Sequence, residues 1–317
     1  MSAQQPVIQT DNLTKVYEGK VRALDSLNLS VQQGEVFGYL GPNGAGKTTT
    51  IRLLLDLIRP TSGSARILGM DVNGDSLAMR RRVGFLPGEL NLWEKMSAQQ
   101  VIQHLANLRG GVDMRYVREL TERLEFDPTR KVRSYSSGNK RKLGLIVAMM
   151  HKPELLILDE PTNGLDPLMQ QTFYQMVLAA RDEGRTVFLS SHILSEVQAI
   201  CDRVGILRSG RLEAVQTVSD LTHADFRWVT LHPREPLMPS ALANVPGVSD
   251  VTADADGTLR LRLSGDFDPL LRAVQSSYIT DIRVEEPTLE EIFLTYYGGM
   301  PANNHHRTEA AARKEGR

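Results

Sequence analysis

The segment GPNGAGKTT, residues 41–49, is the part of this 317-residue chain that most narrows its possible folds. It matches the pattern G-x-x-x-x-G-K-[ST], and it stands between the apolar run EVFGYL (35–40) and the helical run TTTIRLLLDLI (48–58). Glycines let backbone N–H groups curl around phosphates, and the following helix adds the positive end of its dipole. A glycine-rich turn is the plainer alternative, but the flanking strand and helix favour a phosphate-binding loop in an α/β sheet.

Two residues of this loop carry specific chemistry. Lys47 is expected to reach the β- and γ-phosphates of a nucleotide, and the Thr48 hydroxyl is expected to hold Mg²⁺. The residues predicted to bind phosphate are Gly41, Pro42, Asn43, Gly44, Ala45, Gly46, Lys47, Thr48 and Thr49.

Two acidic residues and a histidine follow other apolar runs. The runs ELLILD (154–159) and TVFLSS (186–191) are typical of strands buried on both faces, and ligands bind at the carboxyl ends of such strands. Asp159 is predicted to bind Mg²⁺, and Glu160 is predicted to accept a proton from the attacking water or to orient it. His192 is a candidate γ-phosphate sensor. Without the phosphate loop, a turn or a helix cap would explain the acids, and a structural role would explain the histidine.

Composition and charge limit the remaining possibilities. The 37 basic and 38 acidic residues give a net charge of −1, so no overall field draws the chain to nucleic acid or to an anionic membrane. No apolar run approaches the roughly 18 residues that a membrane crossing requires. The start of the chain lacks the features of a signal peptide, and a single cysteine cannot form an intramolecular disulfide. We expect a cytosolic protein in which Cys201 packs in a buried position.

The pattern changes after residue 221. Four β-rich runs and two short helical runs follow in the order β-α-β-β-α-β, which is typical of a small α+β, ferredoxin-like module. The predicted strands are residues 226–232, 248–254, 258–264 and 278–286, and the predicted helices are residues 240–245 and 268–276. Residues 298–317 are polar and are predicted to be disordered. His305 and His306 in this tail could bind a metal, but no partner ligands stand near them, so a solvated tail is the better interpretation.

The segment YSSGNKRKL, residues 135–143, has two interpretations. Its consecutive basic residues could form a nucleic-acid patch, or its serines and glycine could form half of a nucleotide site. The positive charge is local, and the apolar helical run LGLIVAMM (143–150) follows at once. We therefore interpret Lys140, Arg141 and Lys142 as the solvated first turns of a helix, and the residues before them as half of a phosphate site.

The order of these motifs resembles the ATP-binding subunits of ABC transporters over residues 7–221. Tyr17 comes first, and it is followed by GPNGAGKTT, GFLPGELNLW, YSSGNKRKL, LLILDEPTNGLDP and FLSSH. The serine-glycine segment makes the resemblance specific, because a phosphate loop alone indicates only a P-loop NTPase. The resemblance implies an ABC-type domain over residues 1–221, with a RecA-like core and a helical subdomain at about residues 88–150, that binds ATP and Mg²⁺.

The resemblance also implies roles for individual residues. Tyr17 would stack on adenine, with an ordinary strand aromatic as the alternative. Ser136 and Gly138 would contact ATP held by the Lys47 of a second subunit. Asp166 would lie in the loop that crosses to that subunit and links the two nucleotide sites.

Two positions depart from the family pattern. The family has glutamine after the proline of the loop between the core and the helical subdomain, where it meets the metal and the attacking water, whereas this chain has Gly88 after Pro87. Glu89, one position later, is a candidate replacement. The serine-glycine segment of the family begins Leu-Ser-Gly-Gly, whereas Tyr135 and Ser137 replace the first and third of these residues here.

The end of the chain resembles one branch of the family. The predicted module, residues 222–297, includes most of EEPTLEEIFLTYYGG and is similar to the C-terminal extension of drug and antibiotic exporters of the daunorubicin-resistance type. The branch implies an ATPase on the cytoplasmic side of the cell membrane. Two copies of the subunit, or one copy and a paralogue, would clamp ATP between them and drive a separate permease. GFLPGELNLW is expected to face that permease, although Trp93 could pack in a core instead.

Two other functions fit part of the sequence. Soluble ABC proteins that act on ribosomes or DNA usually carry two nucleotide domains or long coiled coils, and this chain has one such domain and no sustained heptads. An RNA-binding C-terminal module would present exposed aromatic residues on its strands. Phe226 and Trp228 are spaced to face one side of their strand, but none of the other predicted strands offers such an aromatic pair. A regulatory or dimerisation role fits the module better, and no nucleic acid is expected as a partner.

Overall fold

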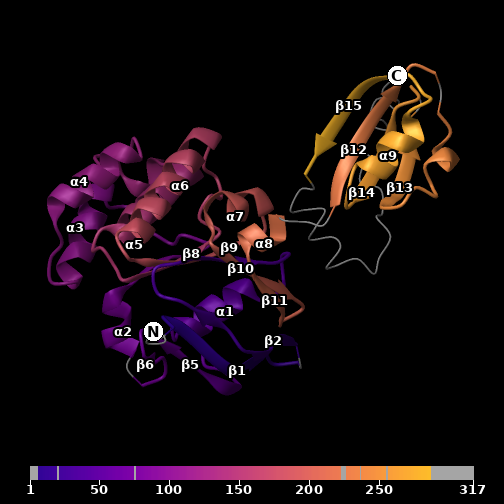
Figure 1. Cartoon of the computed structure of the whole chain (residues 1–317). Helices are drawn as coiled ribbons and strands as arrows, with labels where there is room; N and C mark the ends of the chain where they lie inside the picture. Colours follow the sequence, from indigo (N-terminus) through magenta and orange to yellow (C-terminus); the bar gives the residue numbers. More distant parts are fainter. Residues whose placement is uncertain are drawn as a thin grey trace, which may run out of the picture. The chain divides into compact units, whose positions relative to one another are not determined.

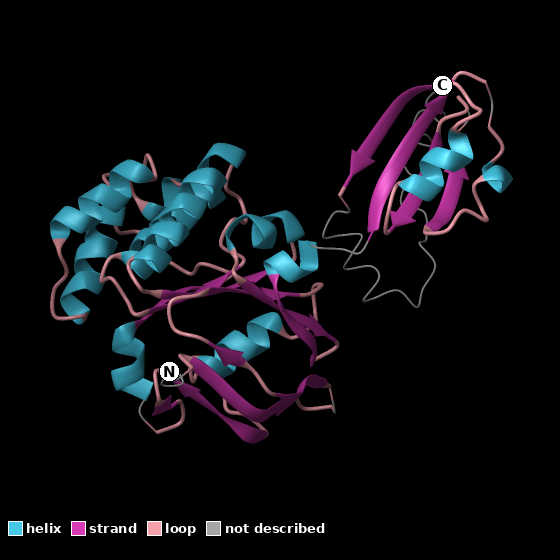
Figure 2. Ribbon diagram, viewed as in Figure 1, coloured by secondary structure: helices cyan, strands magenta, loops and turns pink. Residues whose placement is uncertain are grey.

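The computed structural model describes residues 6–19, 21–74, 76–222, 226–235, 237–254 and 256–286. The chain divides into two compact units, Met1–Ser219 and Asp220–Arg317, and Figures 1 and 2 show their helices and strands. Within the described residues, no helix combines the length and the apolar character that a membrane crossing requires. The predicted tail at 298–317, with His305 and His306, lies outside the described residues.

The first unit is built on a six-stranded sheet in the order β11-β10-β4-β9-β8-β7. Its strands are β4 Val36–Leu40, β7 Val83–Leu86, β8 Leu155–Asp159, β9 Thr186–Ser191, β10 Arg203–Arg208 and β11 Arg211–Thr217. Only the edge strand β11 runs antiparallel to its neighbour. Every residue of β4, β8 and β9 is buried. These apolar runs are therefore strands covered on both faces, as predicted.

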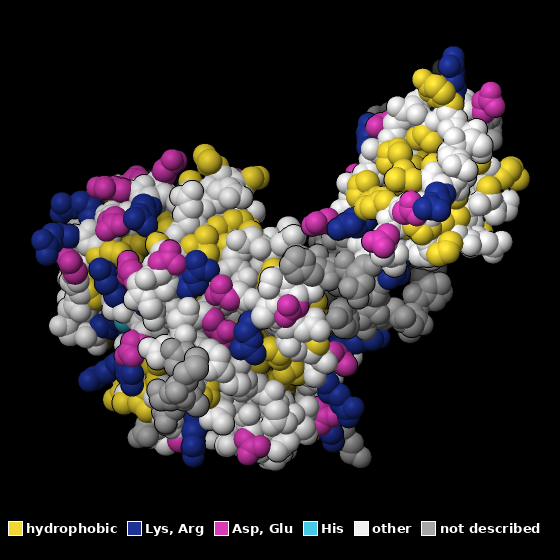
Figure 3. Space-filling model, viewed as in Figure 1, with side chains coloured by type: hydrophobic (Ala, Val, Ile, Leu, Met, Phe, Trp, Pro, Cys, Tyr) yellow, Lys and Arg dark blue, Asp and Glu magenta, His cyan; other side chains and the backbone are white. Residues whose placement is uncertain are grey.

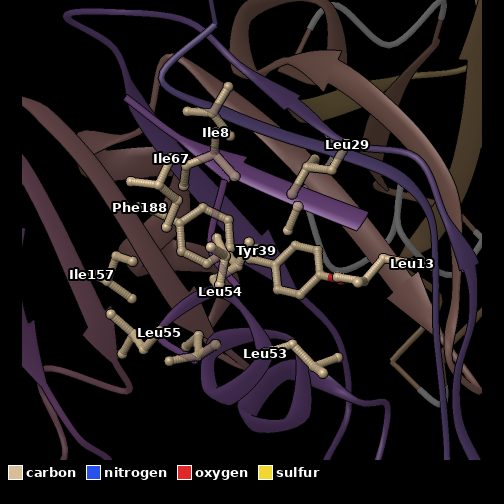
Figure 4. Packing of buried hydrophobic residues seen from close by; sticks show 14 of the residues in the cluster. Ile8, Leu13, Leu29, Tyr39, Leu53, Leu54, Leu55, Ile67, Ile157 and Phe188 are labelled. Carbon is tan, nitrogen blue, oxygen red and sulfur yellow. The ribbon is translucent and has the colours of Figure 1, made fainter. Parts of the chain in front are cut away.

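A second, antiparallel sheet lies next to the first. Its strands are β1 Ile8–Val16, β2 Arg22–Leu27, β3 Ser30–Val31, β5 Ser62–Ile67 and β6 Met70–Asp71. One cluster of buried apolar side chains joins both sheets to helix α1, Lys47–Leu54. Figure 4 shows Tyr39 and Phe188 of the central sheet in this cluster, with ring centroids 5.3 Å apart. The loop between β4 and α1 is therefore anchored in the core at both of its ends.

Helix α1 is shorter than the predicted helical run 48–58, because it ends at Leu54. Asp56 adopts a left-handed backbone conformation with φ 53°. The N–H of Leu57 then donates to the carbonyl of Arg52 at 2.9 Å, which closes the helix with a left-handed cap. The prediction was too long at this end because a continuous apolar run carries no signal for such a cap.

The remaining helices of the first unit fall into two groups. Some lie on the central sheet, and the others pack on those helices. Together they are α2 Ser76–Arg82, α3 Ala98–Leu108, α4 Met114–Arg123, the 3₁₀ turn η1 Val132–Ser134, α5 Ser137–Met149, α6 Pro167–Asp182 and α7 Leu194–Ile200, and the short helix α8, Val218–Thr222, spans the boundary between the two units. Helices α3 and α4 both pack against α5, and α5 in turn packs against β7. The buried Cys201 follows α7, which confirms its predicted packing role. This arrangement places the start of α5 and the loop after β7 close to the end of β8.

The second unit contains a four-stranded antiparallel sheet in the order β13-β14-β12-β15. Its elements are β12 Phe226–Pro233, the 3₁₀ turn η2 Pro239–Ala241, β13 Val248–Ala253, β14 Leu259–Ser264, α9 Asp268–Val274 and β15 Ile279–Glu285. This strand order is that of a ferredoxin-like module, so the predicted fold of this part is confirmed. The predicted helix at 240–245 is wrong, because only the short turn η2 forms there, with Leu242 as its buried anchor.

Candidate active site

The predicted phosphate loop forms the turn between β4 and α1. Glycine is required at two of its positions, because a Cβ on Gly41 would lie 2.4 Å from the Leu207 carbonyl oxygen, and Gly46 adopts φ 112° with a Cβ position 2.5 Å from the Ala23 carbonyl oxygen. The loop lines a pocket of about 160 Å³. The pocket residues are Ala23, Pro42, Asn43, Gly44, Gly46, Lys47, Thr48, Thr49 and Glu160. Residues from the loop and from the end of β8 therefore share one pocket.

Lys47 is buried in this pocket, with 5% of its surface exposed. Its Nζ donates to the carbonyl oxygen of Gly41 at 2.6 Å and lies 3.7 Å from Oε1 of Glu160. Burial lowers the pKa of the Lys47 ammonium, and the negative charges of Glu160 and Asp159 oppose that effect. The loop carbonyls and the acidic pair thus fix this cation where a phosphate group would approach.

Asp159 meets the loop through the Thr48 side chain. The Thr48 hydroxyl donates to Oδ2 of Asp159 at 3.0 Å, and the Ser190 hydroxyl donates to Oδ1 at 2.5 Å. Mg²⁺ prefers oxygen ligands and binds through one or two protein groups together with phosphate and water. The carboxylate and the hydroxyl stand side by side at the loop, so these two residues fit the predicted metal.

Glu160 forms hydrogen bonds with three other residues of the same unit. Its backbone is left-handed, with φ 48°, and its N–H donates to the Ser190 carbonyl at 3.1 Å. Its Oε1 lies 3.1 Å from Nδ1 of His192, and its Oε2 accepts a hydrogen bond from the Asn163 side chain at 2.9 Å. The structure therefore brings Lys47, Glu160 and His192 together, as predicted from their positions at one edge of the sheet. Asn163 was not predicted, although it lies in the quoted motif LLILDEPTNGLDP.

Tyr17 lies apart from this group. It follows β1, its side chain is 38% exposed, and Lys15 Nζ lies 5.2 Å from the centre of its ring. It does not line the pocket of the phosphate loop. The role of Tyr17 at adenine stays a prediction.

The serine-glycine segment forms the start of α5. Ser136 is the exposed N-cap, and its hydroxyl accepts a hydrogen bond from the Asn139 N–H at 3.3 Å. A Cβ on Gly138 would lie 2.6 Å from the Gly164 carbonyl oxygen, so only glycine fits at this position. Ser136 and Gly138 do not line the pocket of the phosphate loop in their own chain. Helix α5 thus begins at an exposed serine whose hydroxyl caps one of its first N–H groups.

Tyr135 has a packing role. Its hydroxyl donates to the Asp127 carbonyl at 2.5 Å, and its ring lies 5.0 Å from that of Phe126. Burial, reinforced by the Asp127 carboxylate, raises the pKa of the Tyr135 hydroxyl. The tyrosine that replaces the family's leucine at this position therefore packs inside the protein.

Comparison with known proteins identifies the family. A family model described as ABC transporter matches residues 24–163. The bacitracin transport ATP-binding protein BcrA of Enterococcus faecalis is 34% identical over 309 residues, which cover 94% of this chain and 99% of BcrA. The linearmycin resistance ATP-binding protein LnrL of Bacillus subtilis (strain 168) is 30% identical over 308 residues, which cover 92% and 98% of the two chains. The chain belongs to the ATP-binding proteins of ABC transporters.

A solved structure of an ATP-binding subunit of an ABC transporter supports the same fold. It matches with a TM-score of 0.63 and 28% identity, and the match covers 68% of this chain and 91% of that one. The predicted ABC-type P-loop fold is confirmed, and this ABC protein is an ATPase that works with a membrane transport component. BcrA and LnrL carry names of antibiotic transport and resistance, so the resemblance to the drug and antibiotic exporter branch is confirmed.

The loop after β7 differs from the family pattern in this ABC protein. A Cβ on Gly88 would lie 3.2 Å from Oδ2 of Asp159, so the position points directly at the carboxylate that fits the metal. Glu89 is exposed. In the part of the chain that the structure describes, no hydrogen bond or ion pair joins Glu89 to Asp159 or Glu160, so the structure does not support Glu89 as the replacement. Trp93, farther along, is 48% exposed and does not pack in a core.

One interpretation of the basic segment is wrong. Arg141 is not solvated, because only 4% of its surface is exposed, whereas the neighbouring Lys140 and Lys142 are half-buried. Its guanidinium donates from Nη1 to the carbonyl of Pro87 at 2.7 Å and from Nη2 to the carbonyl of Gly88 at 2.9 Å. The N-terminal part of α5 is therefore tied to the loop that departs from the family pattern.

Proposed function

We propose that this protein is the ATPase of an antibiotic exporter, in which two nucleotide sites form between two copies of the subunit or between it and a paralogue. The observation that carries the proposal is the split of the site. Lys47, Asp159 and Glu160 are assembled within one chain, whereas Ser136 and Gly138 lie outside their pocket. A partner subunit can supply this second half.

Hydrolysis requires a water aligned with the γ-phosphate and a group that takes its proton. Glu160 is the proton acceptor in this proposal, because its carboxylate stands at the edge of the pocket. His192 and Asn163 donate to its two oxygens and so hold it in one orientation. Lys47 neutralises charge on the β- and γ-phosphate oxygens as the bridging bond breaks. Mg²⁺, when bound by Asp159 and Thr48, supplies further stabilisation of that charge.

The second half of the site is the N-terminal end of α5. This helix runs for 13 residues, and its N-cap, Ser136, is exposed. Unpaired N–H groups and the helix dipole favour an anion at this point. Binding of ATP would close the pair of subunits, and release of the products would reopen it.

We further propose that the pair acts on a separate permease at the cytoplasmic side of the cell membrane and exports an antibiotic or another hydrophobic drug. The support for this substrate class is the similarity to BcrA and LnrL along more than nine tenths of the chain. The exposed Trp93, with its ring edge-on to His104 at 5.4 Å, offers an aromatic contact in the segment expected to face the permease.

Nucleic acid is not part of this proposal. On the face seen in Figure 3, basic and acidic side chains of the first unit are interspersed and not gathered by sign. In the second unit, the rings of Phe226 and Trp228 lie under the guanidinium groups of Arg262 and Arg260, at 3.9 and 4.5 Å. Arginines therefore lie over the aromatic pair that suggested RNA binding, and we keep a regulatory or dimerisation role as the proposal for the module.

The test is the dependence of ATPase rate on protein concentration. Because the complete site needs two chains, the specific activity of the purified protein is expected to rise with concentration and then level off at a dimerisation plateau. The rate of phosphate release, measured over a wide dilution series with an inert carrier protein, gives this dependence. A rate strictly proportional to concentration at all dilutions would contradict a site shared between subunits.

A further inference from the structure

Arg141 is a buried cation at the centre of three segments. It comes from the second turn of α5, and its guanidinium donates hydrogen bonds to the carbonyls of Pro87 and Gly88. Its Nε also donates to the carbonyl of Asn163, at 3.4 Å, in the loop after β8. The same three segments line one cavity of about 410 Å³. A single side chain thus fixes the positions of two loops relative to the helix that begins the second half of the site.

The charge of Arg141 is balanced by the acidic pair of the site. Among the described residues, no carboxylate forms a direct ion pair with its guanidinium. Burial lowers the pKa of Arg141, and the charges of Asp159 and Glu160 oppose that effect. A buried charge is costly unless it is compensated, so the hydrogen bonds to the loop carbonyls hold this cation in place and the two nearby carboxylates favour its charged form.

The loop that Arg141 holds is the loop without a glutamine. Gly88 has no side chain to contact Asp159, and a Cβ at this position would already lie 3.2 Å from its Oδ2. The loop is therefore held through its backbone carbonyls. From Asn163, the connection continues to the reacting groups, because the Asn163 side chain donates to Oε2 of Glu160 at 2.9 Å.

We propose that Arg141 is a positioning residue that fixes the loop at Gly88 where the glutamine is missing, and that it links the movement of α5 to the orientation of Glu160 through Asn163. This inference rests on the proposed ATPase function. It predicts that hydrolysis, and not the binding of ATP, depends on Arg141, because Arg141 does not line the pocket of the phosphate loop.

The first test is a comparison of Arg141→Gln with the matched control Lys142→Gln in the full chain. A small misplacement of reacting groups costs up to about 100-fold in rate, so Arg141→Gln is expected to lower kcat by about 30- to 100-fold. The affinity for ATP, measured with a fluorescent nucleotide, is expected to stay within about 3-fold of the unmodified value, because the substitution removes no contact with the bound nucleotide. Lys142→Gln is expected to leave both values unchanged.

The second test restores the glutamine. In Gly88→Gln alone, the loop stays tied to Arg141 and the new side chain crowds Asp159. In Gly88→Gln/Arg141→Gln the loop is free to shift, and the amide can reach the carboxylate. We expect the double variant to recover at least about 10-fold in kcat over Arg141→Gln, which is the non-additivity expected of residues that share one network.

The outcomes separate the two proposals. A parallel loss of ATP affinity and kcat in Arg141→Gln, or strictly additive effects in the double variant, would overturn the positioning role. If Arg141→Gln does not fold, Arg141→Lys is measured in the same way, because it keeps the charge and loses the two-pronged bond to the loop. A wild-type protein without concentration-dependent ATPase activity would instead contradict the proposed function.

Discussion

The two halves of the proposed ATP site are constructed differently within one chain. In the phosphate-loop half, Lys47 and Asp159 are buried and bonded to neighbouring groups, and Glu160 is held by His192 and Asn163. In the serine-glycine half, Ser136 is exposed, and its hydroxyl caps its own helix. The first half depends on several side chains in fixed positions, whereas the second depends on the start of a helix.

This difference explains where the sequence can depart from the family. A helix start offers backbone N–H groups whatever the neighbouring side chains are, so the replaced residues Tyr135 and Ser137 leave it intact. A residue whose side chain would contact Asp159 cannot be replaced as freely. At position 88, where this chain has glycine, Arg141 donates a hydrogen bond to the backbone carbonyl. Changes in the first half should therefore affect the chemistry itself, and changes in the second should affect the pairing of subunits.

The largest effect is expected from Glu160→Gln. The amide keeps the shape of the side chain but cannot accept the proton of water, so kcat should fall by about 1000-fold while ATP still binds. The variant should then accumulate as a closed dimer with ATP, which size-exclusion chromatography with and without nucleotide measures.

The matched control for this change is Glu122→Gln, on the exposed surface of α4. It should hydrolyse ATP at the rate of the unmodified protein. Turnover near that rate in Glu160→Gln would rule out Glu160 as the proton acceptor.

A smaller effect should show that the halves come from different chains. Lys47→Ala removes the first half of a site, and Ser136→Ala removes a hydroxyl from the second half, so each variant alone should lose at least about 10-fold in ATPase rate. In an equal mixture, half of the randomly formed pairs are mixed, and each mixed pair has one intact site. The mixture should therefore recover roughly a quarter of the unmodified rate.

Two controls sharpen this experiment. Ser137→Ala, one residue away, should keep most of its activity by itself. A mixture of Lys47→Ala and Ser136→Ala whose rate is only the mean of the separate rates would argue that both halves act within one chain.

The phosphate-loop half could be predicted because its geometry follows from a simple rule. Parallel strands end at the same edge of a sheet, so Asp159, Glu160 and His192 were expected near Lys47 from the order of apolar runs alone. The distances of 3.1 and 3.7 Å around Glu160 agree with that expectation. The same rule does not describe a helix start, which is why the role of Ser136 depended on a family resemblance.

Contacts between distant segments account for the predictions that were wrong. Arg141 stands in a run of three basic residues, which is typical of a solvated surface, and its burial depends on the carbonyls of Pro87 and Gly88 more than 50 residues earlier. The predicted helix at 240–245 is a short apolar run in which a single residue, Leu242, is buried. Local patterns indicate which residues are apolar, but they do not indicate which carbonyl or core a side chain will meet.

The smallest effect is expected next to Ser136, at Tyr135. Tyr135→Phe removes the donor to the Asp127 carbonyl and keeps the ring against Phe126. The free energy of unfolding should fall by about 1 kcal/mol, because one hydrogen bond is lost, and the ATPase rate should stay unchanged. In a domain of this size, thermal unfolding should begin about 2 to 4 °C lower.

The matched control is Tyr278→Phe. Tyr278 is 66% exposed, so this substitution should leave the melting temperature unchanged. Calorimetry and the rate of phosphate release on the same samples separate stability from activity. A loss of ATPase activity in Tyr135→Phe at unchanged stability would place the Tyr135 hydroxyl at the nucleotide. The two neighbours, Tyr135 and Ser136, would then act together on ATP, and the serine-glycine half would depend on side chains as closely as the phosphate-loop half does.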